Sequence, residues 1–369
     1  MNKTEKQLGI LLGDILLGKE IKSDEKSALS LLMHGFNNNV SHFLFDSLEK
    51  YIPQQKIPFS ILNNEIQLTY LNVAQLDAWE KVKAAFEEKG IDVIMLKGIY
   101  NRELFQNPDL RTMGDIDLLY KPGDRRKIRK IFIALGFEFE GEDRNHEKYF
   151  CKETCVSFEL HHTLKMVRNY KAPFYDRLFE NAVNYKGFKH IFRLSDEDNY
   201  LFTLIHLQKH LSAGDYSLKR LCDYYIISKT VDTASPYILQ NEKELLADTF
   251  AGELEKVCKI VFEGVESENT ELADSFFDNF DSSEVQRDEK NSKDRIKSFL
   301  GLVFPVPAQI YISYPLIEKH KILLPFGYFF RLFQGFTTRK KNVEIKADSA
   351  KSEKSRAMKE FEIKHGISD

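Results

Sequence analysis

The spacing of apolar residues changes twice along this chain of 369 residues, and these changes constrain the fold more than any other feature. In residues 1–88, apolar side chains recur every three or four positions, as they do on one face of a helix. Residues 89–194 instead contain short runs rich in β-forming residues, separated by helix-like stretches. After residue 195 the helical spacing returns.

We therefore predict an α+β core, a small mixed sheet with helices, that is flanked by helical regions on both sides. The predicted strands are 91–96, 115–120, 137–140 and 156–160, and a helix is expected over 124–135. The predicted organisation is a helical N-terminal region (1–88), the core (89–194), a helical domain (195–336) and a charged tail (337–369).

Composition and charge exclude several classes of protein. The chain is 43% hydrophobic and 30% charged, which is typical of a globular protein and not of a disordered one. Its 53 basic and 56 acidic residues give a net charge of −3, so no overall positive field exists to hold nucleic acid or an anionic membrane. Any contact with RNA must therefore be local.

Neither apolar end segment is typical of a membrane anchor. The first 20 residues are interrupted by Asp14 and lack a small-residue cleavage site, so we expect an amphipathic helix and not a signal peptide. The apolar run 322–336 contains Pro325 and Arg331 and is shorter than the roughly 20 residues that a spanning helix needs. We expect a cytoplasmic protein without stable membrane insertion.

Two aspartates lie in the strand predicted over 115–120. Alternation along a strand places Asp115 and Asp117 on one face, while Ile116 and Leu118 enter the core on the other. Carboxylates held this close repel each other unless a divalent cation lies between them, and oxygen ligands of this kind suit Mg²⁺. The pair therefore predicts a magnesium site.

The strand predicted over 156–160 can extend that site. Its apolar residues alternate with Glu159, and His161 follows on the same face as Glu159. If this strand lies beside the first one, Glu159 adds a third carboxylate. Three such groups can hold two metal ions about 3.5–4 Å apart, an arrangement used for in-line displacement at phosphorus. His161 either lines the site or is a structural histidine.

Residues before the aspartates have the chemistry of a phosphate site. The strand 91–96 runs through Lys97 and Gly98 into an expected helix, so Gly98 allows close approach of a phosphate and Lys97 adds a positive charge. Arg111 either binds phosphate or braces the loop over the acid pair through a bidentate carboxylate contact.

The order of these motifs, Leu96-Lys97-Gly98, Arg111, Gly114-Asp115-Ile116-Asp117 and Glu159-Leu160-His161, resembles the polymerase β-like nucleotidyltransferase superfamily. More narrowly, residues 30–335 are similar to a bacterial nucleotidyltransferase family whose members are largely uncharacterised. The resemblance implies that Asp115, Asp117 and Glu159 are catalytic and bind Mg²⁺, with two ions expected. It also implies contacts with the nucleotide by the residues Lys97, Gly98, Arg111, Gly114 and His161.

This resemblance implies a Mg²⁺-dependent enzyme that moves an NMP group from an NTP to an acceptor and releases pyrophosphate. A small molecule or sugar is the favoured acceptor because the chain is slightly acidic. A toxin-like RNA- or tRNA-modifying enzyme is an alternative, with the basic residues of 121–130 as its RNA contact. A catalytically inactive nucleotide-binding protein is another, because Ile99 stands where the superfamily usually has serine. The oligomeric state is left open.

A pair of histidines lies in the helix that we predict after Ser195. His206 and His210 are four residues apart and, together with Asp223, have some of the character of a zinc site. The spacing lacks a third strong ligand, so we instead expect this helix to pack against the core with His206 near the cleft.

Overall fold

The computed structural model describes residues 1–277 and 307–313, together with residues 317–318, 323–324, 328, 363 and 366. Most of the segments 322–336 and 337–369 therefore lies outside the described residues. Within the described part, no helix has both the length and the apolar character needed to cross a membrane.

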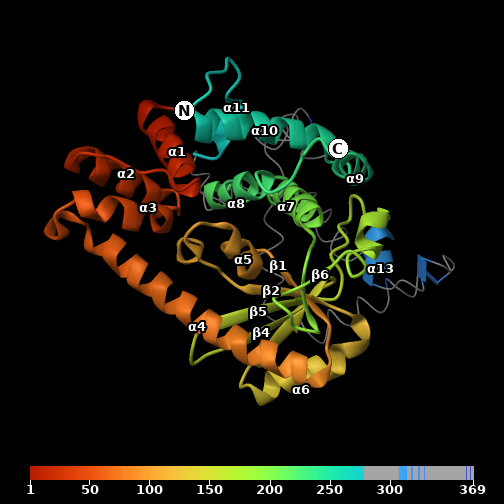
Figure 1. Ribbon diagram of the computed structural model, residues 1–369. Coiled ribbons are helices and arrows are strands. Elements are labelled where there is room, and N and C mark those ends of the chain that lie inside the picture. Colours follow the sequence, from red (N-terminus) through yellow and green to blue (C-terminus); the bar gives the residue numbers. More distant parts are fainter. Residues whose placement is uncertain are drawn as a thin grey trace, which may run out of the picture.

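A mixed sheet of seven strands forms the centre of the described structure, in the order β3-β4-β5-β2-β1-β7-β6 (Figure 1). β1 is antiparallel to β2 and parallel to β7, and β2 is parallel to β5. This is the mixed sheet of the predicted α+β fold class. The strands are β1 (Val93–Leu96), β2 (Ile116–Tyr120), β3 (Glu138–Glu142), β4 (His146–Cys151), β5 (Val156–His161), β6 (Val183–Asn184) and β7 (Ile191–Arg193).

Twelve α-helices are described. Four of them, α1 to α4, precede the first strand, the one-turn α5 follows β1 directly, and the other seven come later in the chain. They are α1 (Lys3–Leu16), α2 (Glu25–Asn37), α3 (Ser41–Leu48), α4 (Phe59–Lys89), α5 (Gly98–Asn101), α6 (Arg125–Ala134), α7 (Asp196–Leu211), α8 (Leu218–Ser228), α9 (Pro236–Glu244), α10 (Asp248–Glu263), α11 (Glu271–Ser275) and α13 (Pro307–Ser313).

Capping residues explain two of the predicted helix ends. The Ser195 hydroxyl accepts a hydrogen bond from the backbone N–H of Asp198 at 3.1 Å, which satisfies a free donor at the start of α7. Gly136 follows α6 with φ +85°, a conformation that glycine adopts without strain, and the chain then enters β3.

The two faces of the sheet are covered differently. α4 and α6 pack on one face, where Ile116, Leu118 and Phe158 are completely buried. The other face carries Asp117 and Glu159 and is directed toward α7 and α8 (Figure 1). Alternation along β2 and β5 therefore separates a core face from a polar face, as predicted.

The N-terminal helices are shared between two cores. α1 to α3 belong to the same core as α7 to α10, whereas α4 contributes Trp79, Val82 and Phe86 to the core beneath the sheet. α1 lies directly against α10 (Figure 1). The contact is close because Gly9 and Gly13 have no side chains: a Cβ on either would lie 2.4 Å from a carbonyl oxygen of α10. The predicted domain boundaries stay a prediction.

Candidate active site

A cleft of about 800 Å³ lies between the polar face of the sheet and the helices α7 and α8. Every residue that the sequence places in the site lines this cleft. These residues are Lys97, Gly98, Arg111, Gly114, Asp115, Asp117, Glu159 and His161.

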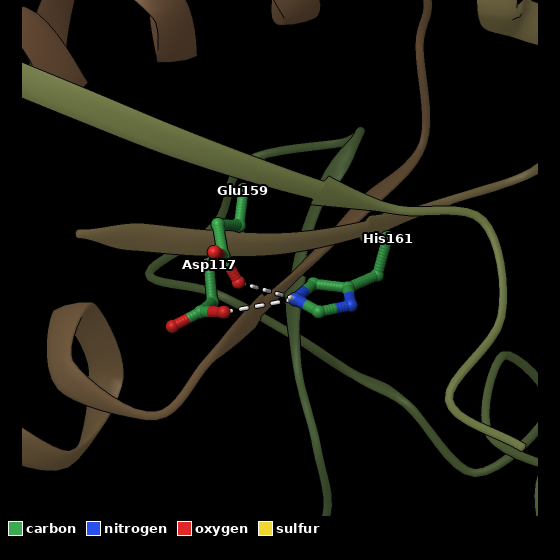
Figure 2. Close-up of side chains that lie close together, drawn as sticks. All are labelled: Asp117, Glu159 and His161. Atoms are coloured by element: carbon green, nitrogen blue, oxygen red, sulfur yellow. Dashed lines mark hydrogen bonds and ion pairs between the residues drawn. The ribbon is translucent and has the colours of Figure 1, made fainter. Parts of the chain in front are cut away.

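Three chemically active side chains converge on the cleft floor from β2 and β5. Asp117 lies directly opposite Glu159 in the parallel register of these strands. Nε2 of His161 is 2.8 Å from Oδ1 of Asp117 and 3.8 Å from Oε2 of Glu159 (Figure 2). One ligand atom from each residue lies within 4.8 Å of the others, so this group can hold a metal ion.

Asp115 lines the same cleft but precedes β2 by one residue and is not part of that close group. Burial, and then the negative charges of Asp117 and Glu159, raise the pKa of Asp115 to about 6. The expected metal set and the close group thus share Asp117 and Glu159 and differ in their third member. The assignment of Asp115, Asp117 and Glu159 as ligands stays a prediction.

Basic side chains neutralise the other two carboxylates. Nζ of Lys97 lies 2.8 Å from Oδ1 of Asp117. Burial would raise the pKa of Asp117, but Lys97 and His161 outweigh it and hold the pKa at about 2. Lys148 forms an ion pair with Glu159, and Nε2 of His146 lies 3.5 Å from Oε1 of the same carboxylate. These two residues lower the pKa of Glu159 against the opposing effect of burial.

His146 and Lys148 lie in β4, opposite His161 and Glu159 respectively, and sequence reasoning did not find them. Burial would lower the pKa of His146, but Asp143 and Glu159 raise it to about 9, so this side chain is a cation at neutral pH. His146 and Lys148 are two residues apart, which places them on the same face of a strand. This signal could have identified them, but residues 146–151 were not predicted as a strand.

The backbone at Lys97 is strained, with φ +45° in a residue that carries a side chain. Gly98 follows at the start of α5. A Cβ on Gly98 would lie 2.8 Å from Cγ of Met113 and 3.2 Å from Nη1 of Arg111. The glycine is therefore needed for packing of the loop before β2, and its expected contact with a phosphate stays a prediction.

Arg111 forms a buried bidentate ion pair with Asp223 of α8. Its Nε is 2.8 Å from Oδ1, and its Nη2 is 2.6 Å from Oδ2. The bidentate carboxylate contact is thus observed, with Asp223 of α8 as the carboxylate, and the contact of Arg111 with a nucleotide stays a prediction. Because Asp223 is engaged in this way, it is not available as a third ligand for His206 and His210, and the zinc site stays disfavoured.

The far wall of the cleft is basic and comes from α7 and α8. His206, near the cleft as predicted, lies next to His210, with their Nε2 atoms 3.1 Å apart. Lys219 of α8 donates to Oγ1 of Thr112 at 2.8 Å, and burial lowers the pKa of Lys219 to about 7. The wall is lined by His206, Lys209, His210, Lys219 and Arg220.

The basic residues of 121–130 lie away from the cleft lining. Arg125 forms ion pairs with Glu142 and Glu147, and Arg129 stacks over the ring of Phe139. α6 therefore uses part of its positive charge in contacts within the molecule.

Comparison with known proteins identifies a protein family that matches this chain. A family model described as uncharacterised nucleotidyltransferase matches residues 27–263. A search of the curated proteins finds no significant match.

Two solved structures are similar over about half of the chain. One is the solution structure of the antibiotic-resistance factor ANT(2'')-Ia, with 14% identity over 50% of this chain and 96% of that one, at a TM-score of 0.36. The other is an antigenic nucleotidyltransferase-like protein from Paracoccidioides brasiliensis, with 17% identity over 51% of this chain and 88% of that one, at a TM-score of 0.33.

Proposed function

Because the chain belongs to the uncharacterised nucleotidyltransferase family, we propose that it transfers an NMP group from an NTP to a small-molecule or sugar acceptor and releases pyrophosphate. The observation that carries this proposal is the placing of Asp115, Asp117 and Glu159 in one cleft, with Lys97 beside them. Carboxylates and a lysine of this kind suit a metal-bound triphosphate.

The residues fit Mg²⁺. Their donors are carboxylate oxygens, the atoms that Mg²⁺ prefers. Asp115 is held near Asp117 and Glu159, and its pKa is raised to about 6 by burial and by their negative charges, both of which a bound cation would offset. Asp115, Asp117 and Glu159 would hold the two expected ions. When bound, these ions would neutralise the triphosphate and the charge that develops at the α-phosphorus.

The side chains of the protein position the other groups. Lys97 now donates to Asp117. If a cation binds the Asp117 carboxylate instead, the ammonium group of Lys97 would be released to pair with the triphosphate. His161 donates from Nε2 to Asp117 and holds its orientation. Rate enhancement would come mainly from positioning and charge neutralisation.

The cleft lies between two walls, and the ion pair of Arg111 with Asp223 ties these walls together. A bounded cleft of this kind suits a small-molecule acceptor. The basic residues of 121–130 that were expected to bind RNA lie on α6, apart from Lys121 before it, and none of them lines the cleft. These two observations support the small-molecule acceptor over the RNA alternative.

The experiment supplies NTP labelled at either the α- or the γ-phosphate, with Mg²⁺ and either a small-molecule metabolite extract or total RNA. We expect label from the α-phosphate, and none from the γ-phosphate, in a small-molecule product that Asp117→Asn does not form. Labelled RNA would favour the RNA-modifying alternative. No transfer in either arm, despite NTP binding, would favour the inactive protein.

A further inference from the structure

Asp215, His210 and His206 form a continuous hydrogen-bonded chain at the cleft wall. Oδ2 of Asp215 is 3.0 Å from Nδ1 of His210. Nε2 of His210 is 3.1 Å from Nε2 of His206, and the two rings meet edge to face at 4.4 Å. Arg220 holds the other carboxylate oxygen of Asp215 at 2.7 Å. The chain leads from the exposed Asp215 to His206 in the cleft lining.

The hydrogen bonds of this chain fix where the protons are. A carboxylate only accepts, so His210 must donate from Nδ1 to Asp215. Neutral His210 then has a lone pair on Nε2, and His206 must donate to it from its own Nε2. Neutral His206 is left with a lone pair on Nδ1, which has no hydrogen-bond partner among the described residues.

The surroundings keep both rings neutral. Burial lowers the pKa of His206 well below its usual value, and the positive charges facing it from three elements act in the same direction. These charges belong to Lys97, Lys209 and Arg220. Burial also lowers the pKa of His210, against the opposing effect of Asp215.

We propose that His206 accepts the proton of the acceptor hydroxyl at Nδ1, and that His210 and Asp215 are positioning residues that hold its tautomer. The proposal rests on the proposed function and adds the base to it. The carboxylate of Glu159 is already engaged by Lys148 and His146, and it is one of the expected metal ligands. Neutral His206 has a lone pair on Nδ1 without a partner among the described residues, and Asp215 supports it through His210.

The acceptor oxygen forms a bond to the α-phosphorus while its proton passes to Nδ1 of His206. The bond from the α-phosphorus to the bridging oxygen breaks, and its electron pair leaves with pyrophosphate. The resulting imidazolium donates through Nε2 to His210, which donates through Nδ1 to the Asp215 carboxylate. The proton later passes from Nδ1 to water.

The first test determines which ring nitrogen of His206 and of His210 carries the proton. Two-bond ¹H–¹⁵N correlation spectra of the labelled full-length protein at pH 7.5 should show His210 protonated at Nδ1 and His206 at Nε2. Asp215→Asn should change the tautomer population of His210, whereas the control His34→Gln on α2 should leave both rings unchanged. His206 protonated at Nδ1, or stoichiometric zinc in the purified protein that His206→Gln removes, would overturn the proposal.

The second test measures proton transfer, with water as the acceptor. His206→Ala should slow pyrophosphate release from the Mg²⁺ complex of the best-binding NTP by about 100-fold, the size expected for a general base, with Kd changed by less than about threefold. Added imidazoles should restore the rate in proportion to their basicity, which a structural role would not produce. Asp215→Asn should give a smaller loss, about tenfold.

The two hypotheses fail in different ways. If wild-type protein binds NTP but releases pyrophosphate no faster than His206→Ala, or if imidazoles restore nothing, the role of His206 is wrong and the nucleotide site stands. If wild-type protein binds no NTP, the proposed function and the role of His206 built on it both fail, although the spectra still show whether the hydrogen-bonded chain exists.

Discussion

Asp115 differs from its two acidic neighbours because no basic side chain is hydrogen bonded to it within the described residues. Asp117 has Lys97 and His161, and Glu159 has Lys148. Asp115 has no such partner in the described part of the chain, and its pKa rises to about 6 through burial and then through the charges of the other two carboxylates. A carboxylate in this position costs stability in the metal-free protein and favours binding of a cation.

Asp115→Asn should consequently stabilise the metal-free protein at pH 8. The folded pKa of about 6 exceeds the usual 3.8, so protonation of Asp115 stabilises the fold fully below pH 3.8, and this contribution is lost as the pH rises through 6. We expect a gain of about 1–2 kcal/mol at pH 8 and almost none at pH 4, measured by thermal unfolding in EDTA.

The exposed Asp77→Asn on α4 is the control and should change little at either pH. Excess Mg²⁺ should reduce or reverse the gain, because the variant loses a ligand. A metal-free Asp115→Asn protein that is less stable than wild type at pH 8 would contradict the account.

At the scale of elements, the buried pair of Arg111 and Asp223 connects the loop before β2 to α8, and so connects the two walls of the cleft. Removing one partner leaves the other charge buried without compensation. Asp223→Leu alone should therefore cost about 3–5 kcal/mol in urea unfolding. The double variant Arg111→Met, Asp223→Leu should cost clearly less than the sum of the single changes; additive losses would refute the coupling.

The contact of α1 with α10 depends on glycine. A Cβ at Gly13 would lie 2.4 Å from the carbonyl oxygen of Phe262, so Gly13→Ala must push the helices apart. We expect a loss of about 1–3 kcal/mol by chemical unfolding. Gly252→Ala within α10 is the matched control, since its Cβ would meet nothing within 4 Å and alanine favours a helix. Equal effects of the two substitutions would show that the close contact is unimportant.

Strand prediction succeeded where alternation was undisturbed. β2 and β5 have an apolar residue at every second position, so the sequence placed Asp117 and Glu159 each on the polar face of its own strand. That the two strands are neighbours was a condition of the prediction, and the structure meets it. β4 has polar residues on both faces because its buried Glu147 is neutralised by Arg125 and hydrogen bonded by Tyr149. The ion pair depends on Arg125 of α6, 22 residues away, so the spacing within residues 146–151 did not reveal β4 or the two basic residues that β4 brings to the site.

At the scale of the whole molecule, the change in apolar spacing located the sheet correctly but did not show how the N-terminal helices are shared. Helical spacing is the same whether a helix packs on the sheet, as α4 does, or on α10, as α1 does. Which helices pack together depends on how well their surfaces fit. Gly9 and Gly13, for example, leave room for α10, and the spacing of apolar residues does not show this.

The central claim is that the acids of the cleft form a cation-dependent nucleotide site. Calorimetric titration of the four NTPs into the full chain, with and without Mg²⁺, tests it most directly in wild type and in Asp115→Asn/Asp117→Asn. We predict binding of at least one NTP that requires Mg²⁺ and is lost in the folded double variant. Absence of binding in folded wild-type protein, or binding that is independent of both Mg²⁺ and the aspartates, would contradict the account.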